Sequence, residues 1–149
     1  MTTAVDYNDL VALLQKQFGK GFTPATDYVE MPAALIAQVA EYMKNTLRFD
    51  FFDMVTAVDY SDHFEIVYRL QSIQNNSLAS FKIKCSKNTS VPSLANLWLG
   101  ANFQEREIYD LFGIEFTGHP NLKRIVLWDG FEGHPLCKDF KGKVYDTAN

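Results

Sequence analysis

The sequence predicts an α+β domain, in which helices pack on one face of a mostly antiparallel sheet and an extended C-terminal arm follows. Two observations lead to this fold class. Two segments with helical periodicity flank a short extended piece, and strands with a period of two then follow as a meander. The length of 149 residues is that of one domain. We therefore predict a single domain over residues 1–149, with residues 103–140 as a distinct motif segment.

The first third of the chain predicts two helices. Asp6–Phe18 forms the first, because its apolar residues recur at helical spacing, at Leu10, Val11, Leu14 and Phe18. Tyr28–Met31 is a short extended piece. Pro32 suits the first turn of a second helix, since its missing N–H has no partner there in any case. Ala33–Lys44 continues this helix with an apolar stripe for the core.

The middle of the chain predicts the meander and the start of a third helical region. Phe49–Asp59 is apolar on both faces, as in a covered central strand. Phe64–Leu70 and Ala79–Cys85 alternate apolar and polar residues, so each has one face toward water. Ser93–Leu99 is predicted as a short helix. A longer charged helix follows, and we expect Gly113 to end it with a positive φ angle.

Composition excludes several classes of function. The net charge of −4 and the pI of about 5.3 argue against nucleic acid as a partner, because phosphate binding needs a basic surface. Cys85 and Cys137 are far apart, whereas iron–sulfur clusters and structural zinc need closely spaced ligands. The chain has neither a G-x-G-x-x-G motif nor a P-loop. No apolar run approaches the roughly 20 residues of a membrane span, so we expect membrane contact only through partners.

The most unusual stretch is residues 103–140. It contains the charged helix E-R-E-I-Y-D-L-F-G at 105–113, then Gly-His-Pro at 118–120 and again at 133–135. An apolar extended run, I-V-L-W at 125–128, lies between the two Gly-His-Pro turns. Glycine permits unusual φ angles and proline fixes φ, so these turns are rigid. Rigid turns around an apolar run indicate a shaped surface for docking.

Each polar group of this stretch has competing interpretations. His119 and His134 could form a metal pair, but no spacing places them on one face with carboxylates, and we favour rigid turns. Arg106 and Asp110 lie four residues apart and can pair on the helix. One interpretation of these charges is a solvent-exposed helix face, where such pairs contribute little to stability. Because buried charges need partners that this chain hardly supplies, we favour contact with another subunit over acid–base catalysis. Cys137 has no visible catalytic partner.

The three motifs together resemble those of the C subunit of the NADH–quinone oxidoreductases, the respiratory complex I family. They read E-R-E-x-Y-D-L-F-G, G-H-P-x-L-x-R-I and G-H-P-L-x-K-D. Related subunits serve membrane-bound energy-converting nickel–iron hydrogenases. The resemblance covers most of the chain and is weakest before Asp27. In that family an arginine usually follows the last Gly-His-Pro-Leu, whereas this chain has Cys137 and so lacks any ion pair that this arginine makes.

The resemblance implies a structural subunit of the peripheral arm of such a complex. It would position the large quinone-site subunit and the iron–sulfur subunits for electron transfer coupled to ion pumping, at the cytoplasmic side of the membrane. The chain itself would hold no catalytic residue, cofactor or metal, and the iron–sulfur clusters and quinone would belong to its partners. The subunit interface would include Glu105, Arg106, Glu107, Asp110, Gly118, His119, Pro120, Arg124, Gly133, His134, Pro135, Lys138 and Asp139.

Two alternatives remain at this level. One is the equivalent subunit of a nickel–iron hydrogenase, which would pass electrons to protons. The other is a free-standing binding module that uses the aromatic residues of its sheet to stack single-stranded RNA.

Overall fold

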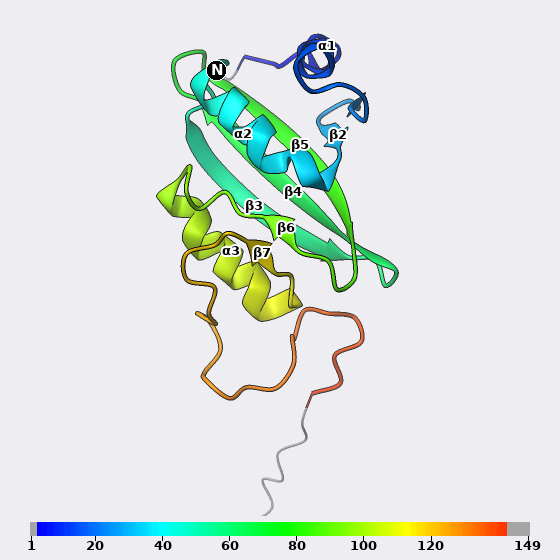
Figure 1. The fold of residues 1–149 in the computed structure, drawn as a ribbon, viewed down its shortest axis with the longest axis vertical. Helices are drawn as coiled ribbons and strands as arrows, with labels where there is room; N and C mark the ends of the chain where they lie inside the picture. Colours follow the sequence, from blue (N-terminus) through cyan, green and yellow to red (C-terminus); the bar gives the residue numbers. More distant parts are fainter. Residues whose placement is uncertain (1–2, 143–149) are drawn as a thin grey trace, which may run out of the picture.

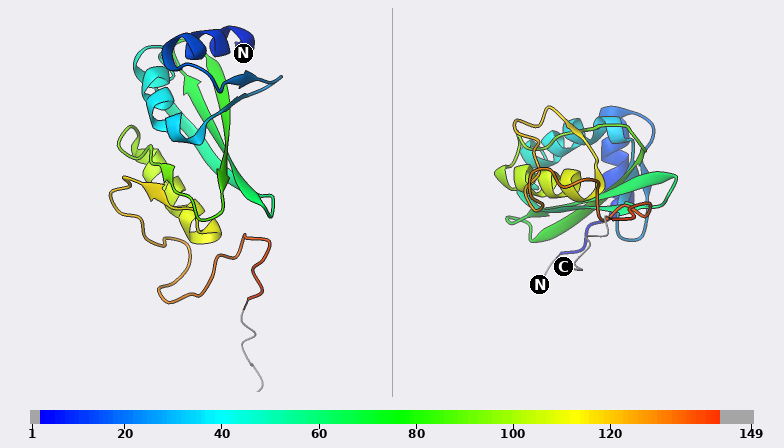
Figure 2. Two further views of the ribbon diagram at one scale, coloured as in Figure 1. Left: turned by 45° about the vertical axis from the view of Figure 1, so that its right-hand side comes forward. Right: turned by 90° about the horizontal axis from the view of Figure 1, so that it is seen from below.

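The computed structural model, which describes residues 3–142, consists of a five-stranded sheet with helices on one side and a long arm after the last helix (Figure 1). The strand order is β1-β2-β5-β4-β3. All neighbouring strands are antiparallel except β2 and β5, which are parallel. Figure 2 shows the three helices on the same side of the sheet. The predicted α+β class and the mostly antiparallel sheet are confirmed.

The elements follow the predicted order closely. They are α1 (Tyr7–Phe18), β1 (Thr23–Pro24), β2 (Val29–Met31), a 3-10 turn (Ala33–Leu35), α2 (Ile36–Asn45), β3 (Phe51–Asp59), β4 (His63–Ser72), β5 (Ser77–Ser86), β6 (Val91–Pro92), α3 (Leu99–Phe112) and β7 (Phe116–Thr117). The two-residue strands β1, β6 and β7 carry no periodicity by which the sequence could have predicted them. β6 and β7 form a separate parallel pair.

The first helix shows why the sequence prediction succeeded there. The carboxylate of Asp6 accepts the backbone N–H groups of Asn8 and Asp9 at 3.0 and 3.2 Å, so it caps α1 at its N-terminus. Gly19 follows Phe18 with a φ of 91° and ends the helix. Leu10, Val11 and Leu14 face the core, as their spacing predicts.

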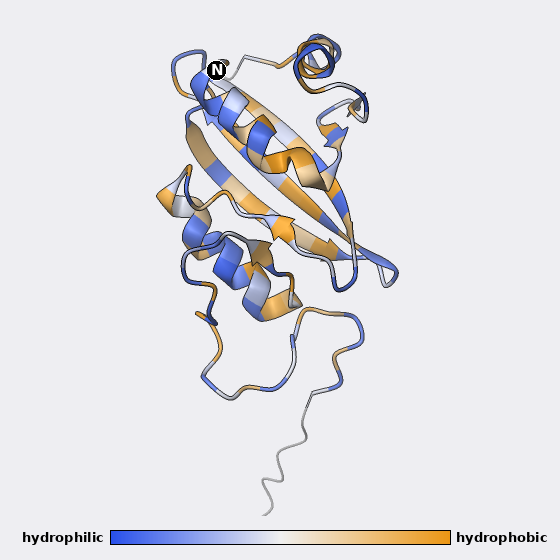
Figure 3. Ribbon diagram, viewed as in Figure 1, coloured by the Kyte–Doolittle hydropathy of each residue, from blue (hydrophilic) through white to orange (hydrophobic). Residues whose placement is uncertain are grey.

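The two long central strands alternate as expected. Figure 3 shows the apolar and polar residues of the sheet in alternation along each strand. The residues on the helix side are buried: Phe64, Ile66, Tyr68 and Leu70 on β4, and Ala79, Phe81, Ile83 and Cys85 on β5. The aromatic rings of these strands therefore belong to the core. This burial contradicts the stacking platform for RNA, because such a platform needs exposed rings.

The prediction of a covered central strand at Phe49–Asp59 is wrong. β3 is the edge strand of the sheet and pairs only with β4. Its Phe51 and Val58 side chains are exposed. The free edge lies beside α3, where the side-chain oxygen of Gln104 accepts the Val55 N–H at 2.8 Å. The apolar character of β3 thus reflects packing against α3 rather than a central place in the sheet.

The helix predicted at Ser93–Leu99 is also wrong. The structure has a single turn at residues 95–97, and α3 begins at Leu99. The Ser93 hydroxyl accepts the N–H of Ala95 at 3.0 Å and donates to Glu105, while the Leu94 N–H also donates to Glu105. The polar groups of residues 93–95 therefore form their hydrogen bonds with the Ser93 and Glu105 side chains, and not within a helix.

The arm leaves α3 through a left-handed residue. Gly113 has φ 79° and ψ 14°, and its N–H donates to the Tyr109 carbonyl, which confirms the predicted helix cap. β7 follows, and residues 118–142 then run without a helix or strand below α3 (Figure 1). The apolar run at 125–128 lies in bends of this arm rather than in a strand.

Candidate docking interface

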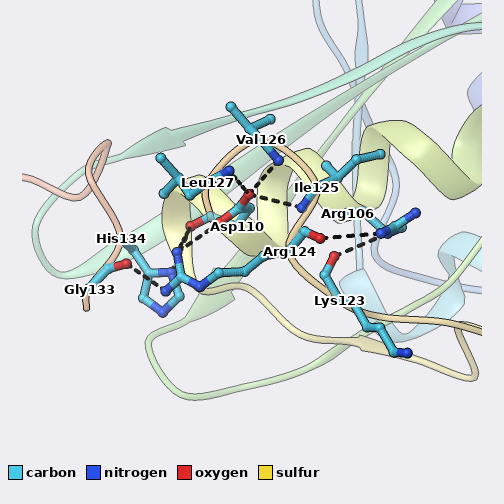
Figure 4. A network of polar contacts seen from close by, with 9 residues as sticks. All are labelled: Arg106, Asp110, Lys123, Arg124, Ile125, Val126, Leu127, Gly133 and His134. Atoms are coloured by element: carbon cyan, nitrogen blue, oxygen red, sulfur yellow. Dashed lines mark hydrogen bonds and ion pairs between the residues drawn. The ribbon is translucent and has the colours of Figure 1, made fainter. Parts of the chain in front are cut away.

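Asp110, on the last turn of α3, is the centre around which the arm folds (Figure 4). One of its carboxylate oxygens accepts the backbone N–H groups of Ile125, Val126 and Leu127 at 3.1, 2.8 and 2.9 Å. The other oxygen forms an ion pair with the Arg124 guanidinium at 2.8 Å. Three consecutive amides that point to one anion fix the backbone of this segment. We call residues 125–128 the docking loop, after the docking role that the sequence predicts for residues 103–140.

The carboxylate of Asp110 remains charged although its side chain is fully buried. Burial by itself would raise the pKa of Asp110. The N–H groups of Leu127, Val126 and Ile125 and the Arg124 guanidinium act in the opposite direction, and the net pKa lies below the ordinary 3.8. The stability that this anchor supplies is therefore complete above about pH 3.8, and it is lost only as the pH falls through the lowered pKa.

The docking loop presents its apolar side chains to the outside. Because the backbone N–H groups turn inward to Asp110, the side chains of Ile125, Val126 and Trp128 remain 38, 57 and 60% exposed. The Trp128 ring meets Phe131 edge-on with 4.9 Å between the ring centroids. The arm thus holds an exposed apolar surface in a fixed shape, which is the arrangement of a preorganised interface.

The second Gly-His-Pro turn caps the C-terminus of α3. The last carbonyls of a helix have no partner within it, and here the arm supplies partners in sequence order. The Asp110 carbonyl accepts from His134 Nδ1 at 2.9 Å, the Leu111 carbonyl from the Leu136 N–H at 2.9 Å, and the Phe112 carbonyl from the Cys137 thiol at 3.0 Å. Burial first, and then the negative charge of Asp59, raise the pKa of Cys137, so the thiol keeps the proton that it donates.

The first Gly-His-Pro turn binds to the other end of α3. The side chain of His119 is fully buried, and its Nε2 atom lies 3.0 Å from the Asn102 carbonyl. Its Nδ1 atom accepts the backbone N–H of Asn121 at 3.0 Å. Nε2 must then carry the proton and donate it to the carbonyl. The histidines of both turns therefore fasten the arm to α3 within this chain.

Arg106 also acts inside the chain. Its Nε and Nη2 atoms donate to the carbonyls of Lys123 and Arg124 at 3.1 and 3.3 Å, just before the docking loop. The predicted pairing of Arg106 with Asp110 is wrong, since Asp110 pairs with Arg124 instead. The tertiary contact wins because Arg124 reaches a desolvated carboxylate, where an ion pair is stronger than on an exposed helix face.

For the oxidoreductase complex that the motifs imply, we expect Arg106→Ala to loosen the entry to the docking loop and to lower the amount of assembled complex, with near-normal turnover per assembled complex. The variant loses two hydrogen bonds from a charged group. Each such bond contributes about 1.5–3 kcal/mol to stability, and less where water competes for the donor. Arg106→Lys should rescue only in part, because one ammonium cannot reproduce the two-pronged contact. Native electrophoresis of solubilised membranes measures assembly. Full assembly without turnover would assign Arg106 to chemistry instead.

A second carboxylate fastens the end of the arm to the sheet. The buried Asp59, at the end of β3, pairs with Lys87 and accepts the Lys138 N–H at 2.8 Å. The Lys87 bond and the backbone N–H contacts outweigh burial and lower the pKa of Asp59 to about 2. An open cavity of about 950 Å³ lies between this end of the sheet and the arm, with Phe112, His134 and Phe140 among its lining residues.

The predicted interface residues fall into three groups by their positions. Glu105, Asp110 and His119 have buried side chains whose hydrogen-bond partners lie in this chain. Arg106, Arg124, His134 and Pro135 are half-buried at the joint between α3 and the arm. The exposed ones, which a partner can reach, are Glu107, Gly118, Pro120, Gly133, Lys138 and Asp139.

Sequence reasoning missed the anchors at Asp59 and Lys87 and the exposed Leu136. Asp59 and Lys87 lie in the meander and just after it, far from the motifs, and no local signal links them to the arm.

Within residues 3–142, no three histidine, cysteine or acidic side chains gather in a metal-binding arrangement. No helix of that same part of the chain is long and apolar enough to cross a membrane.

Comparison with known proteins relates this architecture to one family. Residues 29–146 match the family described as the 30 kDa subunit of respiratory-chain NADH dehydrogenase. The chain is 47% identical over 110 residues to the C subunit of NADH-quinone oxidoreductase from Roseiflexus sp. RS-1, with 70% of this chain and 63% of that protein covered. It is 39% identical over 147 residues to the C subunit from Roseiflexus castenholzii, with 91% of this chain and 84% of that protein covered.

Other relatives are longer than this chain. The mitochondrial NADH dehydrogenase [ubiquinone] iron-sulfur protein 3 of Candida albicans is 43% identical over 134 residues, which are 87% of this chain and 48% of that protein. The chain thus spans about half the length of this mitochondrial relative and less than two thirds of the Roseiflexus sp. RS-1 protein.

A solved structure agrees with this relationship. The trypsin-resistant fragment (1–134) of Nqo5 superposes with a TM-score of 0.64 at 28% identity, over 76% of this chain and 98% of the fragment. The family match spans the motif helix, both Gly-His-Pro turns and the docking loop between them. The chain therefore belongs to the family of the 30 kDa subunit of respiratory-chain NADH dehydrogenase.

Proposed function

We propose that this chain is a structural subunit of an NADH–quinone oxidoreductase and that it binds the large quinone-site subunit through the docking loop. The iron–sulfur clusters and the quinone belong to the neighbouring subunits, which this chain holds in register for electron transfer coupled to ion pumping. It is peripheral and reaches the cytoplasmic side of the membrane through its partners. The relatives from Roseiflexus, both named as parts of NADH-quinone oxidoreductases, support this proposal over the hydrogenase branch.

The observation that carries the proposal is the exposed apolar loop fixed by a buried charge. A loop that only closed its own domain would turn Val126 and Trp128 inward, yet both are more than half exposed. The exposed residues Lys138 and Asp139 supply a polar rim farther along the arm. A rigid apolar centre with a polar rim is the composition of stable protein interfaces, and aromatic residues at such centres dominate the binding energy.

We expect the double variant Val126→Asp with Trp128→Ala to abolish co-purification of the large subunit and leave the melting temperature of the isolated chain nearly unchanged. The backbone N–H of residue 126 still reaches Asp110, so the loop keeps its shape. Loss of one aromatic anchor costs about 2 kcal/mol or more, which is roughly a 30-fold weaker complex, and the buried new charge adds to this. Affinity purification from native membranes with mass spectrometry gives the readout.

A matched control tests whether the location matters. Ile73, in the turn between β4 and β5, is 66% exposed, so Ile73→Asp removes an exposed apolar side chain elsewhere. That turn lies at the end of the sheet away from the arm (Figure 1). We expect normal assembly for that variant. Normal assembly of the docking-loop variant as well would refute the proposal.

A further inference from the structure

A second buried polar cluster lies beneath the N-terminal half of α3, apart from the docking loop. We call it the Glu105 cluster: Glu105, Ser93, Tyr68 and His119. The Glu105 side chain is fully buried, and its two oxygens accept the Leu94 N–H and the Ser93 hydroxyl, each at 2.6 Å. It therefore joins α3 to the connector that precedes it.

In the part of the chain that the structure describes, the cluster lacks the cation that a buried carboxylate normally requires. Among residues 3–142, no lysine or arginine lies within ion-pair distance of Glu105. The nearest basic group is His119, with Nε2 at 4.0 Å, and both of its ring nitrogens are engaged by backbone groups as neutral imidazole. Asp110, five residues later on the same helix, has Arg124 and three amides. An isolated buried charge is far more costly than a paired one.

Tyr68, on β4, supplies an independent observation. Its hydroxyl is the one buried side-chain polar atom of the described residues that has no hydrogen-bond partner. Burial first, and then the charges that Glu105 and Cys85 carry only when they are ionised, raise the pKa of Tyr68 well above 10, so the phenol keeps its proton. Cys85, on β5, is itself neutral, because burial raises the pKa of its thiol. The described residues around Glu105 thus supply dipoles and no compensating charge.

We propose that the Glu105 cluster is a buried proton-binding site, in which Glu105 is a neutral carboxylic acid in the resting fold and ionises as the pH rises. In the acid form Oε2 carries the proton and donates it to the Ser93 hydroxyl oxygen 2.6 Å away, and only the ionised form accepts from both Ser93 and the Leu94 N–H. Proton release would place an unpaired charge between α3, its connector and the first Gly-His-Pro turn. The attachment of that turn to α3 therefore weakens as the pH rises. This inference concerns the chain alone and does not depend on the docking partner.

The direction of the pH effect follows from the proton balance. Burial raises the pKa of Glu105 from 4.5 to about 7, although the Ser93 and Leu94 bonds oppose the shift. Between these two values the folded chain binds a proton that the unfolded chain has released. The stabilising contribution is therefore fully present below about pH 4.5 and is lost as the pH rises through about 7.

Infrared spectroscopy of the full chain tests the proposal directly, because a protonated carboxylic acid has its own carbonyl band. We expect a band of one buried acid at about pH 6 that disappears by about pH 9, one proton per chain. Glu105→Gln should remove this band and abolish the corresponding loss of stability with rising pH. Glu107→Gln, which removes an exposed carboxylate from the same helix, should leave both unchanged.

Tyr68→Phe provides a second test that removes only one hydroxyl group. If Glu105→Gln fails to fold, the titration of Tyr68→Phe decides the question. Its infrared midpoint should move to higher pH, because the ionised carboxylate loses a nearby hydroxyl dipole. No acid band in the wild type at about pH 6, or a midpoint insensitive to Tyr68→Phe, overturns the proposal.

Discussion

Replacement of Asp110 by alanine is expected to detach the arm from α3. The variant lacks the carboxylate that accepts hydrogen bonds from three backbone N–H groups. It also leaves the half-buried Arg124 without its ion-pair partner. Removal of one partner from a buried ion pair costs about 3–5 kcal/mol. Hydrogen exchange should therefore accelerate by roughly 100-fold or more at the amides of Ile125, Val126 and Leu127. Mass-spectrometric or NMR exchange measurements resolve this segment from the sheet.

The control for this prediction lies on the same helix. Glu107→Ala removes an exposed carboxylate three residues earlier and should leave exchange in the docking loop unchanged. Asp110→Asn should fall between the two, because the amide oxygen still accepts N–H groups while the charge for Arg124 is gone. Wild-type exchange rates in Asp110→Ala would show that Asp110 does not organise the loop.

The second large effect is expected for Gly113→Val. Gly113 has a left-handed φ of 79°, which costs a non-glycine residue about 1–2 kcal/mol. A Cβ atom there would lie 2.7 Å from Cδ2 and 2.9 Å from Nε2 of His134. Displacement of this ring breaks the cap of α3, and such overpacking costs about 1–3 kcal/mol more. We expect a total loss of about 2–5 kcal/mol in the free energy of unfolding, measured by denaturant melts.

A substitution at Gly118 separates the conformational cost at Gly113 from the steric cost of the contact with His134. Its φ of 82° is close to that of Gly113, but a Cβ there has nothing within 4 Å. Gly118→Ala should therefore cost only the conformational part, whereas Gly113→Ala should cost more. The pair Gly113→Ala with His134→Ala should show coupling between the two sites. Equal losses for the two alanine variants would show that the contact with His134 is unimportant.

The two buried carboxylates of α3 give the chain opposite responses to pH. Asp110 stabilises the fold above the ordinary carboxylate pKa and fails only in acid. Glu105 stabilises it most when protonated and loses that contribution near neutral pH. The contrast arises because Asp110 has a guanidinium and three amides, whereas Glu105 has two donors and no cation among residues 3–142.

Elements with strong local patterns could be predicted from the residues alone. The caps at Asp6, Gly19 and Gly113 are local chemistry, since each depends on a side chain or a φ angle within one turn of its helix. The alternation of β4 and β5 follows from the period of two, because one face of each strand is buried. The motifs of residues 103–140 likewise indicated a rigid surface and the family without knowledge of the fold.

The partners of the charges on that surface depend instead on tertiary packing. Asp110 meets Arg124 and the docking loop, and Asp59 meets Lys138, across separations of 14 to 79 residues in the chain. No local pattern encodes such pairs, because a buried charge takes whichever donors the fold brings to it. The edge position of β3 escaped prediction for the same reason, since its apolar residues pack against a helix that lies farther along the chain. The residue types predicted a docking segment, and the packing of α3 against the arm determined which side chains of that segment remain exposed.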